Sequence, residues 1–434
     1  MGYQKPGGRR QFPLCRFLSW ASKLHHLAVG RSYFFLRYFY SRLMRRVSLL
    51  IPILVLVARM AAFAQAVNAI NFNHWYDPLA EVVLQFKPVN HGDSIEVFYR
   101  VKCNNAIATP YLVKWERRES YAQRQGTSMG STDTVTLSKN WMERRFVFNR
   151  PAKPWLLVVR LSNVATGKTW HFYRLIEAHH PVNGYLDSEG KQKQWDAFVL
   201  AEDVYTLHGS GSGKPIFVSF YADNFPTPAP PFVVKELKMD KFLFPDSTFI
   251  VMPGATAGPF KKEGLYLAQE DTSAAFGFSF YVRHSPYPKY NKLTDLKGPL
   301  LFVTTREENA ALEKAGEDKA SFDKVILDIT KDKDRARTFM RNYFRRIELA
   351  NLYFTSFKEG WKTDRGMIFT IFGLPDEVNF DGGFEYWSYK NPRQAFRFAR
   401  AGSVYHPEHS VLVREKGYTE YWYQAIDLWR KSRY

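Results

Sequence analysis

The chain has 434 residues, of which 45% are hydrophobic and 24% charged, and this composition is typical of a folded globular protein. A chain of this length favours about two to four domains. The net charge of +19 is concentrated at the start, because residues 1–66 contain eleven Lys or Arg and no Asp or Glu. The remainder carries about +8 with neither a basic stripe nor a recognisable nucleic-acid-binding module, so we expect no nucleic-acid partner.

Residues 44–66 have the layout of a secretory signal peptide. Two arginines follow Met44, an apolar run covers residues 47–58, and small residues stand at the two positions of Ala64-Gln65-Ala66 that a signal peptidase reads. We therefore expect cleavage after Ala66 and a periplasmic or secreted protein. The alternative is an inner-membrane anchor formed by residues 47–67, but the apolar run falls short of the roughly 20 residues that a spanning helix needs. Membrane contact is expected only through this segment, if it stays uncleaved.

Residues 1–43 precede this signal and are interpreted as a spurious upstream extension, with Met44 as the true start. A genuine basic, aromatic extension that faces a membrane is the alternative. Cleavage after Ala66 would leave Cys103 as the single cysteine of the chain, so no internal disulfide is expected. Because no histidine stands near it in the sequence, we interpret Cys103 as a core thiol.

Two successive regions of the sequence predict β structure. Residues 67–182 contain short alternating runs such as "SIEVFYRV" and "WLLVVRLS", which are typical of a β-sandwich. Residues 183–300 predict a second β-rich domain, in which the proline run 225–232 forms a surface connection or an edge. The glycine-rich segment 208–215 precedes a strand instead of a helix, so we interpret it as a hairpin tip and not a phosphate loop.

Residues 301–434 predict an α+β domain. Apolar residues recur at steps of three and four over a long helix at about 333–356. The run "MIFTIF" (residues 367–372) is expected to be a buried strand, and further strands follow. The fold class is therefore mainly β, with an N-terminal β-sandwich, a second β-rich domain, and a C-terminal helix with an antiparallel sheet.

Candidate chemistry is sparse. His406 and His409 lack the helical spacing of a zinc site and are interpreted as an exposed polar turn. A carbohydrate site is the alternative function, because an acidic loop lies beside aromatic residues that could stack on a sugar. The residues of this loop hypothesis are Trp361, Asp376, Glu377, Asp381, Glu385, Tyr386 and Trp387. Because acidic residues are also routine in turns, we predict no catalytic residue, no metal ion and no cofactor, and hence no enzyme.

The stretch "GWKTDRG" (residues 360–366) concentrates unusual residues before the apolar run. Its glycines permit a sharp change of direction, and Trp361 can anchor the turn to the preceding helix. Thr363 and Asp364 can accept hydrogen bonds from nearby backbone N–H groups. The planar guanidinium of Arg365 can donate two hydrogen bonds to a carboxylate, and Asp376 is a candidate partner. Each residue type therefore has a structural use, and we interpret Trp361, Thr363, Asp364, Arg365, Asp376, Glu385 and Trp387 as motif residues that are more structural than ligand-binding.

These residues resemble the GWxTD domain, a bacterial family named after its Gly-Trp-x-Thr-Asp signature. The preceding "RNYFRRIELANLYFTSFKE" and the following "FGLPDEV", "FEYWSYK" and "YWYQAIDLWRK" extend the resemblance over about 260–434. The resemblance implies an exported envelope protein and supplies no catalytic residues. We therefore predict a non-enzymatic binding or assembly protein whose partners are other envelope proteins, with a glycan as the alternative ligand.

Overall fold

The computed structural model describes residues 65–105, 107–130, 133–188, 192–211, 213–234, 243–391 and 393–434. The predicted upstream extension 1–43 and nearly all of the predicted signal peptide 44–66 lie outside these residues. The chain from Ala66 to Tyr434 forms one compact unit. Its division into domains at 182/183 and 300/301 stays a prediction. Within the described part, no helix is both long enough and apolar enough to cross a bilayer.

The N-terminal region is a β-sandwich, as predicted. One sheet has the order β1-β2-β6, and the other has the order β4-β3-β7-β8 with β5 paired to β3. Apolar side chains from alternate positions of both sheets, Val97 and Leu157 among them, form the core between them. Cys103 is fully buried there and donates to the carbonyl O of Leu137, as expected of a core thiol. The strands are β1 (Val82–Asn90), β2 (Ser94–Cys103), β3 (Thr109–Arg118), β4 (Thr127–Ser128), β5 (Asp133–Leu137), β6 (Met142–Asn149), β7 (Trp155–Asn163) and β8 (Thr169–Ile176).

The second β-rich region also contains two sheets, ordered β10-β9-β12-β15 and β11-β17-β16-β13-β14. The glycine-rich segment 208–215 precedes a strand as expected, but it connects strands of different sheets, so its interpretation as a hairpin tip is wrong. The strands are β9 (Tyr185–Ser188), β10 (Gln192–Lys193), β11 (Phe198–Leu200), β12 (Tyr205–His208), β13 (Ile216–Ala222), β14 (Ser247–Val251), β15 (Thr256–Ala257), β16 (Gly264–Gln269) and β17 (Phe278–Arg283).

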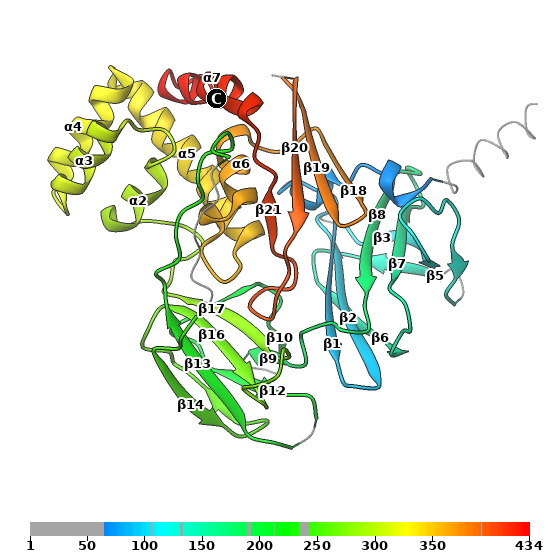
Figure 1. The fold of residues 1–434 in the computed structure, drawn as a ribbon. Coiled ribbons are helices and arrows are strands. Elements are labelled where there is room, and N and C mark those ends of the chain that lie inside the picture. Colours follow the sequence, from blue (N-terminus) through cyan, green and yellow to red (C-terminus); the bar gives the residue numbers. More distant parts are fainter. Residues whose placement is uncertain are drawn as a thin grey trace, which may run out of the picture. The chain divides into compact units, whose positions relative to one another are not determined.

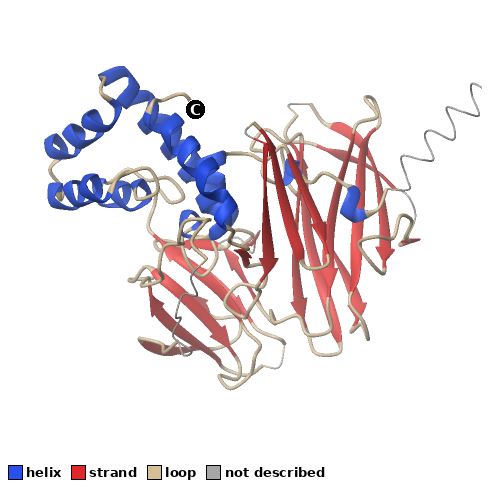
Figure 2. Ribbon diagram, turned by 45° about the horizontal axis from the view of Figure 1, so that its top comes forward, coloured by secondary structure: helices blue, strands red, loops and turns tan. Residues whose placement is uncertain are grey.

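The C-terminal region combines helices with the antiparallel sheet β18-β19-β20-β21. Figures 1 and 2 show this sheet between the helices on one side and the β-sandwich on the other. The long helix α5 covers Lys333–Phe354. The other elements are α2 (Leu293–Leu300), α3 (Arg306–Ala315), α4 (Lys319–Thr330), α6 (Asp364–Phe372), α7 (Thr419–Arg430), β18 (Glu377–Asp381), β19 (Phe384–Lys390), β20 (Arg393–Arg400) and β21 (Ser410–Leu412).

The expectation of a strand over "MIFTIF" is wrong, because these residues are the last six of the nine residues of α6. Thr363 caps the N-terminus of this helix, and Gly373, with a φ of 83°, ends it. Residues from Gly366 to Phe372 are all buried, so the segment shows no amphipathic period. A short, uniformly apolar run cannot be assigned to helix or strand from periodicity alone.

The segment before the sandwich packs against the C-terminal region. Val67, Ile70 and Phe72 belong to the same hydrophobic core as Trp387 and Phe369. The backbone N–H of Phe72 donates to the carbonyl O of Val378 (2.8 Å). The start of the described chain is thus tied to β18, far along the sequence.

Candidate functional site

The motif segment 360–366 sits against the C-terminal end of α5. A Cβ atom on Gly360 would clash with the backbone of Ala350, and one on Gly366 would clash with the carbonyl O of Gly360. Neither glycine has a positive φ, so close backbone approach is the reason for glycine at both positions. We call residues 360–366 the motif junction.

Thr363 and Trp361 fix the geometry of the motif junction. The Thr363 hydroxyl donates to the carbonyl O of Gly360 (2.7 Å) and accepts from the N–H of Gly366 (3.0 Å). The backbone N–H of Trp361 donates to Oδ1 of Asn351 in α5 (3.1 Å), and its indole N–H donates to the hydroxyl of Tyr290 (2.9 Å). Both side chains are therefore used within the fold, with the indole 3% exposed.

Asp364 forms a bidentate ion pair with Arg414. Its Oδ1 and Oδ2 atoms accept from the guanidinium at 2.5 and 3.2 Å, and Oδ2 also accepts from the backbone N–H of Leu412 (2.8 Å). Arg414 donates further to the carbonyl O of Ala229, within the proline-rich connection (3.0 Å). The motif aspartate therefore links α6 to β21 and to the second β-rich region.

Arg365 pairs with Glu385 of β19, and not with Asp376 as the sequence suggested. The guanidinium lies 3.2 Å from Oε2 of Glu385, whose side chain is only 4% exposed. Burial by itself would lower the pKa of Arg365, but the Glu385 carboxylate raises it above its ordinary value. Asp376 instead accepts from the backbone N–H of Lys390 (2.7 Å).

Glu385 also receives hydrogen bonds from two aromatic side chains. The hydroxyl of Tyr76 and the indole N–H of Trp387 both donate to its Oε1 atom (2.6 Å each). Trp387 is fully buried. The structure thus brings Arg365, Glu385 and Trp387 together inside the protein and leaves Asp376 at the surface. Neither Trp361 nor Trp387 offers a ring face on which a sugar could stack.

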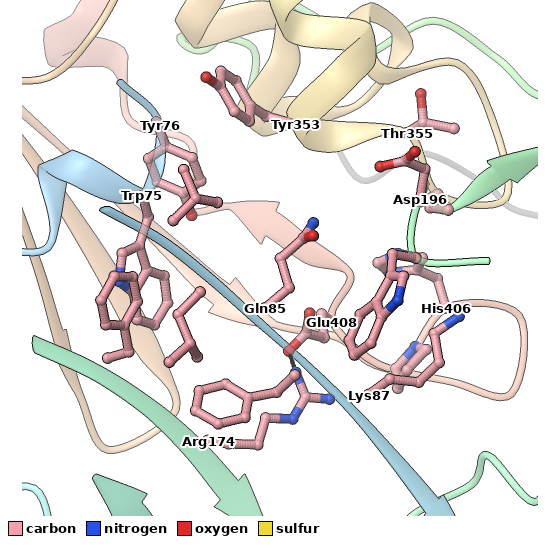
Figure 3. Close-up of a pocket in the computed structure, with 18 of the residues that line it drawn as sticks. Trp75, Tyr76, Gln85, Lys87, Arg174, Asp196, Tyr353, Thr355, His406 and Glu408 are labelled. Atoms are coloured by element: carbon pink, nitrogen blue, oxygen red, sulfur yellow. Dashed lines mark ion pairs between the residues drawn. The ribbon is translucent and has the colours of Figure 1, made fainter. Parts of the chain in front are cut away.

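A groove of about 890 Å³ lies beside the sandwich and is bordered by all three regions of the chain (Figure 3). Its walls come from β1 and β8, the C-terminal end of α5, residues 194–197 and the loop 406–408. Figure 3 shows Gln85 and Lys87 on β1, with Tyr353 of α5 across from them. This volume is in the range of ordinary ligand pockets.

The face of β1 and β2 that lies away from the sandwich core brings cations and indole rings to the groove. The guanidinium of Arg100 lies 4.1 Å from the ring centre of Trp141 and 5.0 Å from that of Trp195. Lys102 places its ammonium 4.6 Å from the Trp141 ring. Such stacking holds the cations in place and leaves their hydrogen-bonding edges available.

Lys87 is the innermost of these cations. Burial lowers its pKa to about 8, and Asp196 partly opposes this effect. Its ammonium donates to the backbone carbonyl O of Gln194. Among the described residues, no carboxylate lies within ion-pair distance of Lys87, Arg100 or Lys102, which makes this cluster the electropositive part of the groove.

Two histidines line the groove, and one of them, His406, was set aside in the sequence interpretation. His406 and His409 are half-buried, so their interpretation as an exposed polar turn is wrong, and burial lowers the pKa of His406 to about 3. His180 is buried and its ring contacts the carbonyl O of Pro88 (3.2 Å). Beside them Arg174 is paired with Glu408. No three His, Cys, Asp or Glu side chains gather as metal ligands anywhere in the described ranges.

Sequence reasoning did not identify the groove. Its residues come from positions between 74 and 410, and each belongs to a segment that looked like an ordinary strand, loop or helix. One local signal was present: Arg100 and Lys102 are two residues apart in a strand and therefore share a face.

Comparison with known proteins identifies the C-terminal part of the chain. Residues 264–431 match the model of the GWxTD domain. No curated protein gives a significant match to the chain. A beta-glucosidase from Listeria innocua in complex with isofagomine is 14% identical over 21% of this chain and 16% of its own, with a TM-score of 0.15.

Two further solved structures show similarly low agreement. A chaperone–tip adhesin complex of CFA/I fimbriae is 11% identical over 46% of this chain and 93% of its own, with a TM-score of 0.18. Red sea bream transglutaminase is 10% identical over 47% of this chain and 31% of its own, with a TM-score of 0.20. Agreement at this level identifies neither a fold nor an activity. The match over residues 264–431 does identify a domain, and this part of the chain is a GWxTD domain.

Proposed function

We propose that this protein is an exported, non-enzymatic binding protein of the bacterial envelope, and that the groove is where its partner binds. The observation that carries this proposal is the cluster of Lys87, Arg100 and Lys102, none of which forms an ion pair with a carboxylate of the described residues. Charged groups in a cleft favour a partner of opposite charge.

The motif junction supports a role in holding this groove together. Asp364, Arg365 and Thr363 make their hydrogen bonds inside the protein, and Arg365 and Glu385 also border the groove. Substitution of the motif would therefore act on the groove through the fold. The alternative carbohydrate site at residues 376–387 has less support, because Trp387 is fully buried and Glu385 is only 4% exposed.

Site-specific photo-crosslinking tests the binding role. Leu352 of α5 lines the groove and is 43% exposed, so a benzoylphenylalanine at this position would react with a bound partner. Val164, which is 58% exposed in the loop between β7 and β8, is the matched control away from the groove. We expect a discrete crosslinked product in envelope fractions from position 352 and none from position 164. Equal labelling at both positions, or none at position 352, would contradict the proposal.

Export has its own test. N-terminal sequencing of the protein purified from the host envelope should begin at Val67. A chain that retains residues 47–66 would support the membrane-anchored alternative instead.

A further inference from the structure

Strand β1 has an unpaired edge. It is the outermost strand of the sheet β1-β2-β6 and pairs with β2 alone. The N–H of Asn90 donates to Val182 on the side away from β2, whereas the carbonyl O of Glu81 accepts from Asn104, next to the end of β2. Because backbone direction alternates along an antiparallel strand, Leu84 and Phe86 direct their N–H and C=O groups to the same side as Asn90.

This edge is covered at one end and open in the middle. The His180 ring contacts the carbonyl O of Pro88, and the carbonyl O of Val182 accepts a hydrogen bond from the N–H of Asn90. The backbone groups at this end of β1 are therefore already occupied. The backbone groups of Leu84 and Phe86 find no hydrogen-bond partner in the described chain, and both residues line the groove. Unpaired strand edges are ready templates for another strand.

The second sheet of the sandwich ends at the same groove. Strand β8 is its outermost strand, and Tyr173 and Leu175 line the groove. The carbonyl O of His171, also on the free side of β8, is already occupied by the indole N–H of Trp75 (3.3 Å). Residues at the outer edges of both β1 and β8 thus line the groove.

The two faces of β1 differ in chemistry. Leu84 and Phe86 turn their side chains toward the sandwich core. Gln85 and Lys87 lie on the opposite face, where Gln85 is paired in register with Arg100 and Val83 with Lys102. Asp196 and Glu143 are the acidic groups nearest Arg100, and Asp187 and Asp196 are those that act on Lys87. A strand added to β1 would therefore lie beside Leu84 and Phe86 on one face and beside Gln85 and Lys87 on the other, with Arg100 and Lys102 one strand further away on β2.

We propose that an extended segment of a partner protein adds to the free edge of β1, with acidic and apolar residues in alternation. Its apolar side chains lie opposite Leu84 and Phe86, and its acidic side chains lie opposite Gln85 and Lys87, next to Arg100. Main-chain hydrogen bonds to β1 hold the segment, and the cations select its charge. This inference rests on the proposed function, because it specifies the partner of the same groove.

Synthetic peptides test the alternation and the charge. The probe is a peptide of about eight residues, the length of an ordinary strand, in which glutamate and valine alternate. One control peptide has lysine in place of glutamate, and another has the same composition with glutamates and valines in separate blocks. We expect the alternating acidic peptide to bind the full chain about tenfold more tightly than either control, in fluorescence anisotropy. Equal affinity of all three peptides would overturn the proposal.

Hydrogen exchange tests the strand pairing. Exchange of the amides of Leu84 and Phe86 should slow by about tenfold or more when the acidic peptide binds. Polyglutamate and inorganic polyphosphate serve as polyanions without the alternation. If these polyanions bind as tightly as the peptide and no protection appears at Leu84 or Phe86, the groove is a general polyanion site and strand addition is refuted.

Charge-neutralising variants locate the contact. The double variant Arg100→Gln/Lys102→Gln should weaken peptide binding about tenfold, as expected for two partly exposed ion pairs. Lys139→Gln, at an exposed position of the same sandwich, is the control and should bind normally. Unchanged binding by the double variant, with its circular dichroism also unchanged, would overturn the assignment. A crosslinked partner at position 352 together with failure of every peptide would refute strand addition while leaving the proposed function intact.

Discussion

The motif junction and the groove both concentrate charged side chains, but they use them differently. At the motif junction, Asp364 forms an ion pair with Arg414, and Arg365 forms one with Glu385. Lys362 forms ion pairs with Asp223 (2.9 Å) and Glu359 (2.8 Å). Every one of these charges has an opposite charge within the fold. Such pairs fix geometry more than they add net stability, because burial of both partners is costly.

In the groove, Lys87, Arg100 and Lys102 contact a carbonyl O, a glutamine side chain and indole rings. None of the three forms an ion pair with a carboxylate of the described residues. The charges of the signature residues are thus paired within the fold, whereas the cations that we propose to bind a partner come from segments outside the signature. Removal of a charge should therefore destabilise the fold at the motif junction and spare it in the groove.

The largest effect is expected for Gly366→Ala. The added Cβ would clash with the carbonyl O of Gly360. Because this atom belongs to tightly packed backbone and not to a flexible side chain, it cannot easily move away. We expect a loss of about 4 kcal/mol or more in the free energy of unfolding, measured by urea denaturation. Gly417→Ala is the control, because nothing lies near its Cβ position, and it should change stability by less than about 0.5 kcal/mol. Similar values for both variants would refute the close-approach argument.

Asp364→Ala is expected to have the second largest effect. It would leave Arg414, whose side chain is only 17% exposed, without its carboxylate. Removal of one partner of a buried ion pair leaves an uncompensated charge, and we expect a loss of about 3 kcal/mol. Asp323→Ala breaks the exposed pair with Lys319 and should cost less than about 0.5 kcal/mol. A stable Asp364→Ala protein that lost only partner binding would instead give the motif a direct binding role.

Tyr76→Phe tests how firmly the first described segment is attached. The variant removes the hydroxyl that donates to Glu385 (2.6 Å), one of three groups that stabilise this buried carboxylate. Hydrogen bonds to charged groups contribute about 1.5–3 kcal/mol, so we expect a loss of about 2 kcal/mol in urea denaturation. Tyr423→Phe, at an exposed position of α7, is the matched control. Equal stability of the two variants would mean that the buried carboxylate of Glu385 does not need the hydrogen bond from Tyr76.

Much of this fold was predictable from local pattern. Alternating runs predicted the sandwich strands, and the three- and four-residue period predicted the helix that forms α5. The uniformly apolar α6 was not predictable, because its burial on all sides removes the period that distinguishes helix from strand. The N-cap Thr363 was present as a signal, but the neighbouring glycines suggested a turn into a strand.

The long-range pairs of the site were beyond sequence reasoning. Asp376 stands eleven residues from Arg365 and Glu385 stands twenty, and nothing in the spacing indicates which carboxylate turns inward. The choice depends on the pleat of β19, which places Glu385 and Trp387 on the same buried face. The groove was equally hidden, because Lys87 and Trp195 become neighbours only when separate regions of the chain pack together.

The smallest expected effect has the opposite sign. Lys87→Met removes a half-buried ammonium that has no carboxylate partner in the described chain, and it keeps an apolar stem of similar length. We expect the variant to be more stable than the wild type by about 1 kcal/mol at neutral pH, since burial of an unpaired charge is unfavourable. The same substitution should weaken binding of the alternating acidic peptide.

The pH dependence of Lys87→Met provides the decisive measurement. In the folded protein burial lowers the pKa of Lys87 from 10.5 to about 8, with Asp196 and Asp187 acting against this shift and Arg100 and Lys193 adding to it. Between these two values the unfolded chain binds the proton more tightly, so wild-type stability should rise relative to that of the variant as pH increases from about 8 to 10.5. Urea denaturation of both proteins across this range measures the difference. A constant difference would show that the Lys87 ammonium is solvated or paired, and the contrast between the groove and the motif junction would then fail at this residue.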